Sequence, residues 1–206
     1  MMRAILACAA VLLAGCLSQP HTPEPALYDL GFAQGGGAVP ARASAEPSVA
    51  RVRVSAPSWL DHTSMHYRLL YVDEMRTLAY AYARWIAPPA ELVGQRLRQT
   101  LAESGAAARR GSASVHEIAV ELEEYVQVFE TPTRSFGRVS VEVRLFGPST
   151  GEARFTEQAA AQTPDAAGGV RALAAATDVL ITRIVAWVGA SEDQEADTQV
   201  ARPVVK

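Results

Sequence analysis

The sequence predicts an α+β domain: an antiparallel sheet with two main helices packed on one side, between a flexible N-terminal tether and a C-terminal tail. Two observations carry this prediction. Apolar and charged residues alternate over residues 115–129 and 138–145, as in half-buried strands. An apolar stripe at helical spacing then runs from Val170 to Val188, and would cover the apolar face of that sheet. The length of 206 residues, with 49% hydrophobic, is enough for one core.

The first fifteen residues have the pattern of a lipoprotein signal peptide. One charge, Arg3, precedes an apolar run over residues 4–12, which is too short for a permanent membrane span and fits a cleaved signal. The run Leu13-Ala14-Gly15-Cys16 follows and resembles a bacterial lipobox. Small residues let the backbone enter the peptidase cleft, and the Cys16 thiol takes the lipid. An ordinary signal peptide with a chance cysteine, or a buried thiol, is the alternative.

Residues 16–26 are predicted to be the lipidated N-terminus and its tether. This stretch is polar and contains three prolines, which keep a chain extended. Two or more acyl chains, such as palmitate, anchor a protein stably where one does not. Leu17 stands where an aspartate would be the usual inner-membrane retention signal. By resemblance to that sorting rule, we expect the periplasmic face of the outer membrane of a Gram-negative bacterium.

Short strands are predicted along the first half of the mature chain. Residues 27–32 form a candidate first strand, and residues 49–54 alternate valine with arginine. Residues 65–72 and 77–85 are predicted to form a hairpin around residues 73–76, because tyrosine and leucine side chains share one face of each strand.

A helix is predicted to follow this hairpin. It begins at Pro88 and Pro89, because the first turn of a helix does not need the N–H that proline lacks. Apolar residues recur every four positions from Val93 to Leu101, and Gly105 ends the helix.

The strongest strand signal lies over residues 115–129. Ile118 to Val128 would place their apolar side chains on one face, but Glu124 breaks the pattern, so we expect a bulge or a strand end there. A long hairpin loop over residues 131–137 then precedes the next strand, and a third strand follows. The other face of this antiparallel meander is predicted to be exposed to solvent. Its expected ion pairs join Glu121 and Glu123 to Arg138 and Arg144.

The long second helix is predicted to start near Asp165. Residues 27–189 then form the domain. Residues 190–206 are polar without periodicity, and are predicted to be a disordered tail.

Composition and motifs exclude several classes of function. A net charge of −3 opposes nucleic-acid binding, and two cysteines cannot make a disulfide framework. The G-x-S-x-G, P-loop and HExxH motifs are absent, so we predict no enzyme, no metal and no cofactor beyond the lipid on Cys16. His62 and His66, beside Asp61, have a metal-ligand spacing on a helix, but a strand is expected there. Ser64 with His66 lacks an oxyanion motif, which disfavours an anchored hydrolase.

Six aromatic residues fall within 27 positions. They are Trp59, Tyr67, Tyr71, Tyr80, Tyr82 and Trp85. Core packing and half-exposed strand faces would explain most of them. The alternative is an exposed aromatic surface for protein or lipid contact, for which Tyr80, Tyr82 and Trp85 are the candidate partner or oligomer contacts.

Four stretches carry a family resemblance. They are YDLG at 28–31, VRVSAPSWLD at 52–61, M-x-Y-R-L at 65–69 and LAYAYARWIAPPAELV at 78–93. Together they resemble the ABC-type transport auxiliary lipoprotein family, which includes the lipoprotein of the paraquat-inducible system. The pattern Y-A-x-A-R-W-x-A-P-P-A-E-L is the most specific part. Within it, Trp85, Pro88 and Pro89 carry over as fold-defining positions at a strand-to-helix corner.

The resemblance implies a function by association. Such lipoproteins work with a mammalian-cell-entry (MCE) protein and an ABC permease and ATPase that move lipids or other hydrophobic molecules between two membranes. They dock at the outer membrane or complete the periplasmic conduit, in some members as a ring-shaped homo-oligomer. One alternative stays open: an outer-membrane lipoprotein that regulates or assembles a different envelope machine, such as a cell-wall synthase or a secretion pore.

Overall fold

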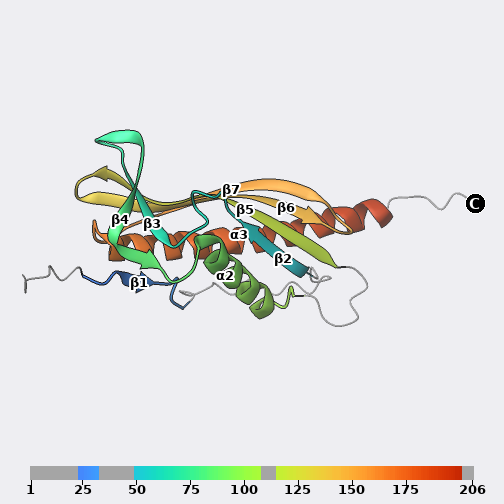
Figure 1. Ribbon diagram of the computed structural model, residues 1–206. Helices are drawn as coiled ribbons and strands as arrows, with labels where there is room; N and C mark the ends of the chain where they lie inside the picture. The colour runs from blue at the N-terminus through green and yellow to red at the C-terminus, as the bar shows by residue number, and fades with distance from the viewer. Residues whose placement is uncertain (1–22, 33–48, 108–114, 201–206) are drawn as a thin grey trace, which may run out of the picture.

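The computed structural model describes residues 23–32, 49–107 and 115–200, with side chains up to residue 191, and places a curved sheet over two helices (Figure 1). The elements in chain order are β1 (Ala26–Tyr28), β2 (Val49–Ser55), β3 (Ser64–Leu69), β4 (Asp73–Trp85), α2 (Pro89–Glu103), β5 (His116–Thr131), β6 (Arg134–Phe146), β7 (Gly151–Ala160) and α3 (Ala166–Val200). Both helices lie on the same side of the sheet, so the predicted α+β class and its layer arrangement are confirmed.

The seven-stranded sheet is mixed, whereas a purely antiparallel sheet was predicted. Its order is β1-β4-β3-β5-β6-β7, with β2 also paired to β5. The predicted antiparallel meander β5-β6-β7 and the β3–β4 hairpin are present. Three pairs are parallel: β1 with β4, β2 with β5 and β3 with β5. β5 is long enough for β2 to pair with its first half and β3 with its second half, and the chain reaches it through the crossover helix α2.

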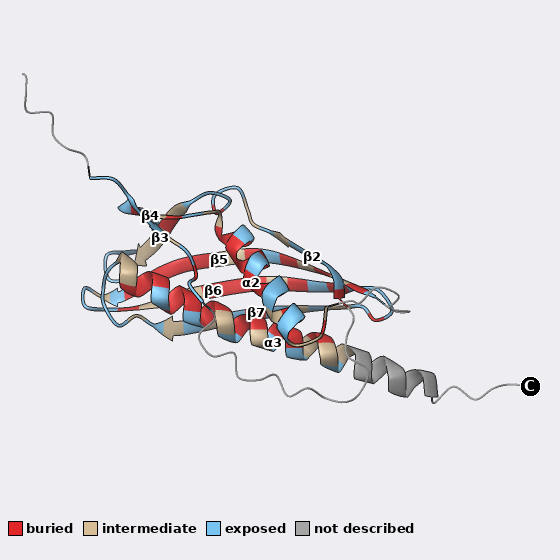
Figure 2. Ribbon diagram, turned by 90° about the horizontal axis from the view of Figure 1, so that it is seen from below, coloured by how far each residue is buried: buried red, intermediate tan, exposed pale blue. Residues whose placement is uncertain are grey.

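Helix α3 forms one wall of the core. Its first turn is capped by Asp165, whose Oδ1 accepts a hydrogen bond from the N–H of Gly168 at 2.7 Å. The hydrogen bonds from Gly168, and then from Thr163, also lower the pKa of the Asp165 carboxyl. The helix lies against β5, β6 and β7, and its buried side faces the sheet (Figure 2). Residues 166–191 are long and apolar enough to cross a membrane, but half of the most apolar stretch is buried on the sheet, as in a core helix.

A bulge in β5 changes which side chains face this core. The register with β6 shifts between Leu122 and Glu124, where the sequence pattern breaks. After the shift, Tyr125 faces α3, with its hydroxyl 3.4 Å from Oγ1 of Thr177. Because side chains alternate along a strand, Val126 and Val128 turn to the opposite face. The prediction that they share a face with Ile118 is therefore wrong.

Two boundaries also differ from the predictions. The β5–β6 connection is a two-residue turn at Pro132 and Thr133, where a long loop was expected. Helix α3 continues to Val200, although a disordered tail was expected from residue 190. Residues 190–200 contain neither glycine nor proline, and Pro203 is the first helix breaker. Residues 201–206 lie outside the described part of the chain.

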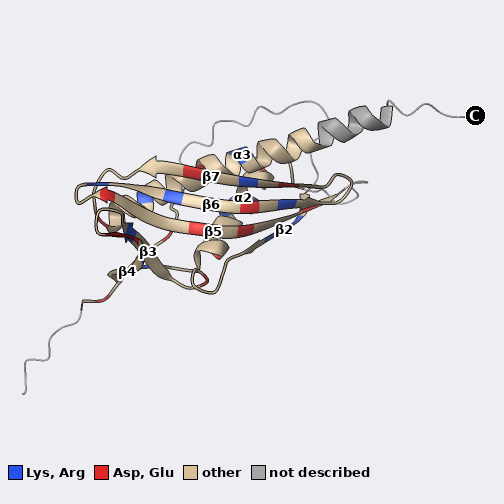
Figure 3. Cartoon of the chain, turned by 90° about the horizontal axis from the view of Figure 1, so that it is seen from above, with Lys and Arg blue, Asp and Glu red and all other residues tan. Residues whose placement is uncertain are grey.

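The face of the sheet away from the helices carries charged pairs (Figure 3). The predicted pairing of Glu121 and Glu123 with Arg138 and Arg144 does not form among the described residues. Instead Glu123 pairs with Arg154 at 2.8 Å, and Glu124 with Arg138 at 2.8 Å. The bulge turns Glu124 to this face, where it meets Arg138. Each such exposed pair contributes only about 0–1 kcal/mol.

Candidate functional site

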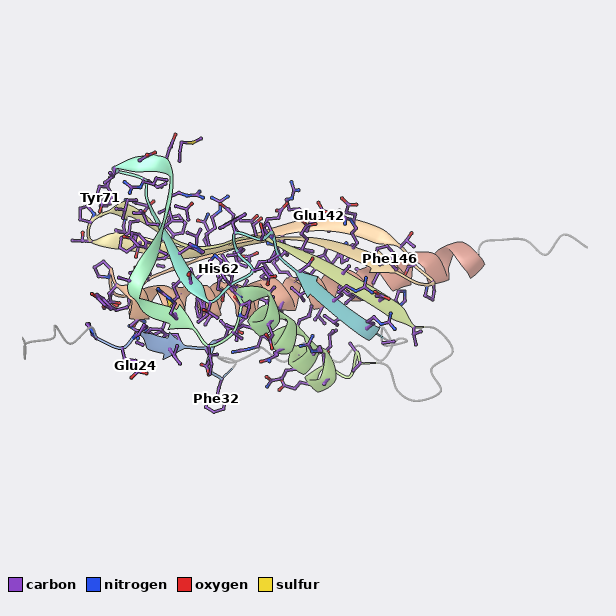
Figure 4. The ribbon with its side chains drawn as sticks, in the orientation of Figure 1. Glu24, Phe32, His62, Tyr71, Glu142 and Phe146 are labelled. Atoms are coloured by element: carbon purple, nitrogen blue, oxygen red, sulfur yellow. The ribbon has the colours of Figure 1, made fainter. Side chains whose placement is uncertain are left out.

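The β3–β4 hairpin carries most of the candidate aromatic residues. It projects beyond the sheet, with Tyr71 near its tip (Figures 1 and 4). The turn lies at residues 70–72, slightly before the predicted position at 73–76, because β4 already begins at Asp73. The base of the hairpin is packed against β5, so its two ends have different environments.

Tyr80 is held inward at the base of this hairpin. Its ring lies 4.6 Å from that of Tyr67, and its hydroxyl donates to Oε1 of Gln127 at 2.9 Å. Gln127 is fully buried and donates through Nε2 to Oγ of Ser135 at 2.9 Å. Burial raises the pKa of the Tyr80 phenol, so it stays neutral. Tyr80 therefore has a structural partner of its own, which weakens it as a contact for another molecule.

We expect Tyr80→Phe to lower the free energy of unfolding by about 1 kcal/mol, because it leaves a buried acceptor of Gln127 without this donor. Urea denaturation followed by circular dichroism measures the change. Tyr82→Phe is the matched control and should change stability by less than about 0.5 kcal/mol, as for a surface site. Equal effects of the two substitutions would contradict the assigned role of the Tyr80 hydroxyl.

Tyr82 and Trp85 differ sharply in exposure. Tyr82 is 55% exposed and lies where the register between β3 and β4 shifts. Trp85 is 1% exposed and packs edge-on against Tyr125, with ring centroids 5.5 Å apart. The prediction that Trp85 contacts a partner is therefore corrected: it fills the core at the corner where Pro88 and Pro89 begin α2. Of the three predicted contact residues, only Tyr82 presents a large surface.

An apolar groove of about 590 Å³ lies between the β1 segment and the first half of α3. Leu27, Phe32 and Ile86 line it and are strongly exposed. Val170 and Ala174 contribute the helix side. A groove of this size is within the range of small-ligand sites. The position of Phe32 is visible at the lower edge of the molecule (Figure 4).

Arg96 fixes the segment that borders this groove. It is 5% exposed, and donates to the carbonyl oxygens of Leu30 at 2.9 Å and Gly31 at 2.6 Å. Its other nitrogen donates to Asp178 of α3 at 2.8 Å. One guanidinium of α2 therefore joins α3 to the segment that leads from the predicted tether.

The histidines are arranged for packing. The rings of His62 and His66 lie 5.1 Å apart, and Nδ1 of His62 accepts the N–H of Ser64 at 3.2 Å. Burial, and then His62, lower the pKa of His66. Across the described residues, no three His, Cys, Asp or Glu side chains are grouped to hold a metal ion.

A second serine–histidine contact was not singled out from the sequence. Nε2 of the buried His116 lies 2.8 Å from Oγ of Ser149 and accepts the N–H of Ser149 at 3.2 Å. This ties the β6–β7 turn to the start of β5.

The predicted lipobox, Leu13 to Gly15, and the lipidation site Cys16 lie outside the described residues. Their roles stay predictions.

Comparison with known proteins decides the family. The family of ABC-type transport auxiliary lipoprotein components matches residues 28–188. The chain belongs to this family. This auxiliary lipoprotein shares its fold with two solved structures. One is a Xanthomonas campestris protein of the DUF330 family, at 17% identity and a TM-score of 0.63, covering 75% of this chain and 92% of that one. The other is an uncharacterised protein, at 12% identity and a TM-score of 0.62, covering 81% and 99%. No curated protein matches significantly.

Sequence reasoning missed two features of this auxiliary lipoprotein. The groove is lined in part by Leu27 and Ile86, whose segments are brought together by the parallel β1–β4 pairing. Arg96 lies in the predicted helix, but no sequence motif gives it a role. The one signal for it was an arginine at a helix position whose neighbours in the apolar repeat, Val93 and Leu97, are buried.

Proposed function

We propose that this chain is a non-catalytic lipoprotein on the periplasmic face of the outer membrane, and that it serves an MCE/ABC-type system for intermembrane transport of lipids or other hydrophobic molecules. The observation that carries the proposal is the family match, which spans nearly the whole described domain. Membership of an auxiliary transport family implies partners in a transporter complex and attachment to the cell envelope. The MCE partner, the outer membrane and the lipid cargo are the parts proposed here.

The arrangement of the domain supports a docking role. The first described strand, β1, begins at Ala26, ten positions after Cys16, so an anchor at Cys16 would hold the domain close to a membrane. Arg96 ties the residues after β1 to both helices. A pull on the anchor would therefore be resisted by the contacts of Arg96 as well as by the pairing of the short strand β1.

Co-purification tests the proposed partners. The lipoprotein, tagged at its C-terminus, is extracted in mild detergent after brief cross-linking in cells. We expect an MCE-domain protein and its permease among the retained proteins. Retention of a cell-wall synthase or a secretion pore without any MCE protein would contradict the proposal.

Cys16→Ser is expected to abolish lipid labelling, to block maturation and to remove the mature protein from the membrane fraction, because the thiol is the acylated nucleophile. Radiolabelled palmitate and membrane fractionation measure the result. Cys8→Ser is the matched control: it lies in the segment that is cleaved away, so labelling should persist. A Cys16→Ser protein that still takes up palmitate would contradict the assignment.

A further inference from the structure

The tip of the β3–β4 hairpin is apolar where a turn is normally polar. We call Leu70, Tyr71, Val72 and Met75 the hairpin tip. Val72 is 65% exposed and Met75 87% exposed. Turns usually contain Gly, Pro, Asn or Asp, for conformational reasons. These apolar side chains are not needed to form the turn.

The backbone of the tip is satisfied without its side chains. The N–H of Leu70 donates to the carbonyl of Phe129 at 2.9 Å, and that of Val72 to Leu69 at 3.1 Å. The N–H of Met75 donates to Oδ1 of Asp73 at 3.0 Å. The hairpin is therefore held in place while its apolar side chains face outward. An exposed apolar cluster of this kind marks an interaction surface.

The tip lies at the same end of the molecule as β1, the first described strand. Figure 1 places β1 and the β3–β4 hairpin at one end of the molecule and the last described turns of α3 at the other. Ala26 pairs with Ala83, and the ten residue-to-residue steps of β4 from Asp73 to Ala83 span at most about 33 Å. The ten residue-to-residue steps from Cys16 to Ala26 can reach about 36 Å. The anchor and the tip can therefore meet one bilayer surface together.

We propose that the hairpin tip inserts shallowly into the bilayer that holds the chain's own lipid anchor. A convex apolar tip suits a deformable apolar medium, and a second attachment point complements acyl chains. Asp73, Glu74 and Arg76 are exposed beside the tip, and would remain among the lipid headgroups, because burying them in hydrocarbon is costly. The inference rests on the proposed anchor at Cys16 and adds an orientation: the hairpin end of the domain faces the membrane.

Site-specific fluorescence tests this orientation. Tyr71→Cys and Phe146→Cys form a matched pair, because both side chains are 47% exposed and lie at opposite ends of the molecule (Figure 4). Each mature lipoprotein is labelled with an environment-sensitive dye and reconstituted into phosphatidylethanolamine–phosphatidylglycerol vesicles that contain nitroxide lipids. We expect a blue shift and strong quenching at position 71, and neither at position 146. Equal signals at the two positions would overturn the proposal.

Two further arms separate the tip from the anchor. A chain that starts at Leu17 keeps every residue of the described core, which has no member before Tyr28. When this unacylated chain is added to the same vesicles, replacing Leu70, Val72 and Met75 with serine should lower its partitioning about tenfold or more. If Cys16 takes up no palmitate but the serine substitutions still lower partitioning, only the anchor is refuted. If the serine substitutions leave partitioning unchanged, the membrane role of the tip is refuted. The labelled protein is also measured in native membranes to which nitroxide lipids are added. A blue shift at position 71 without quenching there would assign the tip to a protein partner and overturn the bilayer proposal.

Discussion

Arg96→Met is expected to lower the free energy of unfolding by about 3 kcal/mol, because breaking a buried charged pair leaves desolvated polar groups behind. The substitution removes the donors to the carbonyls of Leu30 and Gly31, and the cation beside Asp178. For a domain of this size the melting temperature should fall by about 6–12 °C. Thermal and urea unfolding followed by circular dichroism measure the loss.

Hydrogen exchange should locate the damage at the tether end. The N–H of Ile86 donates to the carbonyl of Tyr28 at 2.8 Å, so its protection reports whether β1 stays paired. In Arg96→Met we expect this amide to exchange faster than the amides in the middle of α2. Arg98→Met is the matched control: it lies on the exposed side of the same helix and should leave both stability and exchange nearly unchanged. If Arg98→Met lowers the free energy of unfolding as much as Arg96→Met does, the contacts of Arg96 with Leu30, Gly31 and Asp178 are not the cause.

The elements with strong periodicity were predictable from the sequence. The alternation in β5 and β6, the proline start of α2 and the apolar stripe of α3 each identify an element by its own residues. The two helices and the antiparallel meander follow from these local signals. The parallel pairings of β1, β2 and β3 do not, because they join segments far apart in the chain through backbone hydrogen bonds that carry little side-chain signal.

The bulge shows how one residue limits prediction from pattern. Glu124 marked the place where the alternation of β5 fails, and a bulge was one of two expected explanations. The sequence alone did not show that every later side chain then changes face. For that reason Gln127, which an unbroken alternation would place on the face away from the helices, is buried and bonded to Tyr80.

The candidate site was less predictable than the fold. Composition identifies an aromatic cluster, but exposure depends on the partners that the fold supplies. Tyr125 and the core take up Trp85, and Gln127 holds Tyr80, whereas no described residue covers Tyr82 or the hairpin tip in this way. Arg96 could not be assigned from the sequence, because two of its partners are backbone carbonyls.

Gly137→Ala is expected to destabilise the domain by about 2–3 kcal/mol through overpacking. Gly137 lies in β6, directly beneath α3. A Cβ atom there would stand 2.6 Å from the backbone nitrogen of Leu173 and 2.7 Å from the carbonyl carbon of Ala172. Neither atom belongs to a side chain that can rotate away, so the helix must lift off the sheet. The melting temperature should fall by about 4–12 °C.

Gly189→Ala is the matched control, with the opposite expected sign. Gly189 lies within α3, and an added Cβ meets no atom within 4 Å. The substitution therefore gains helix propensity without a clash, and should stabilise the domain by up to about 1 kcal/mol. Opposite shifts of the two variants would establish that close contact between α3 and β6, not the loss of a glycine, causes the damage in Gly137→Ala. If Gly137→Ala melts at the wild-type temperature, then α3 does not lie as close to β6 as described, and the packing assigned to the core of this lipoprotein is wrong.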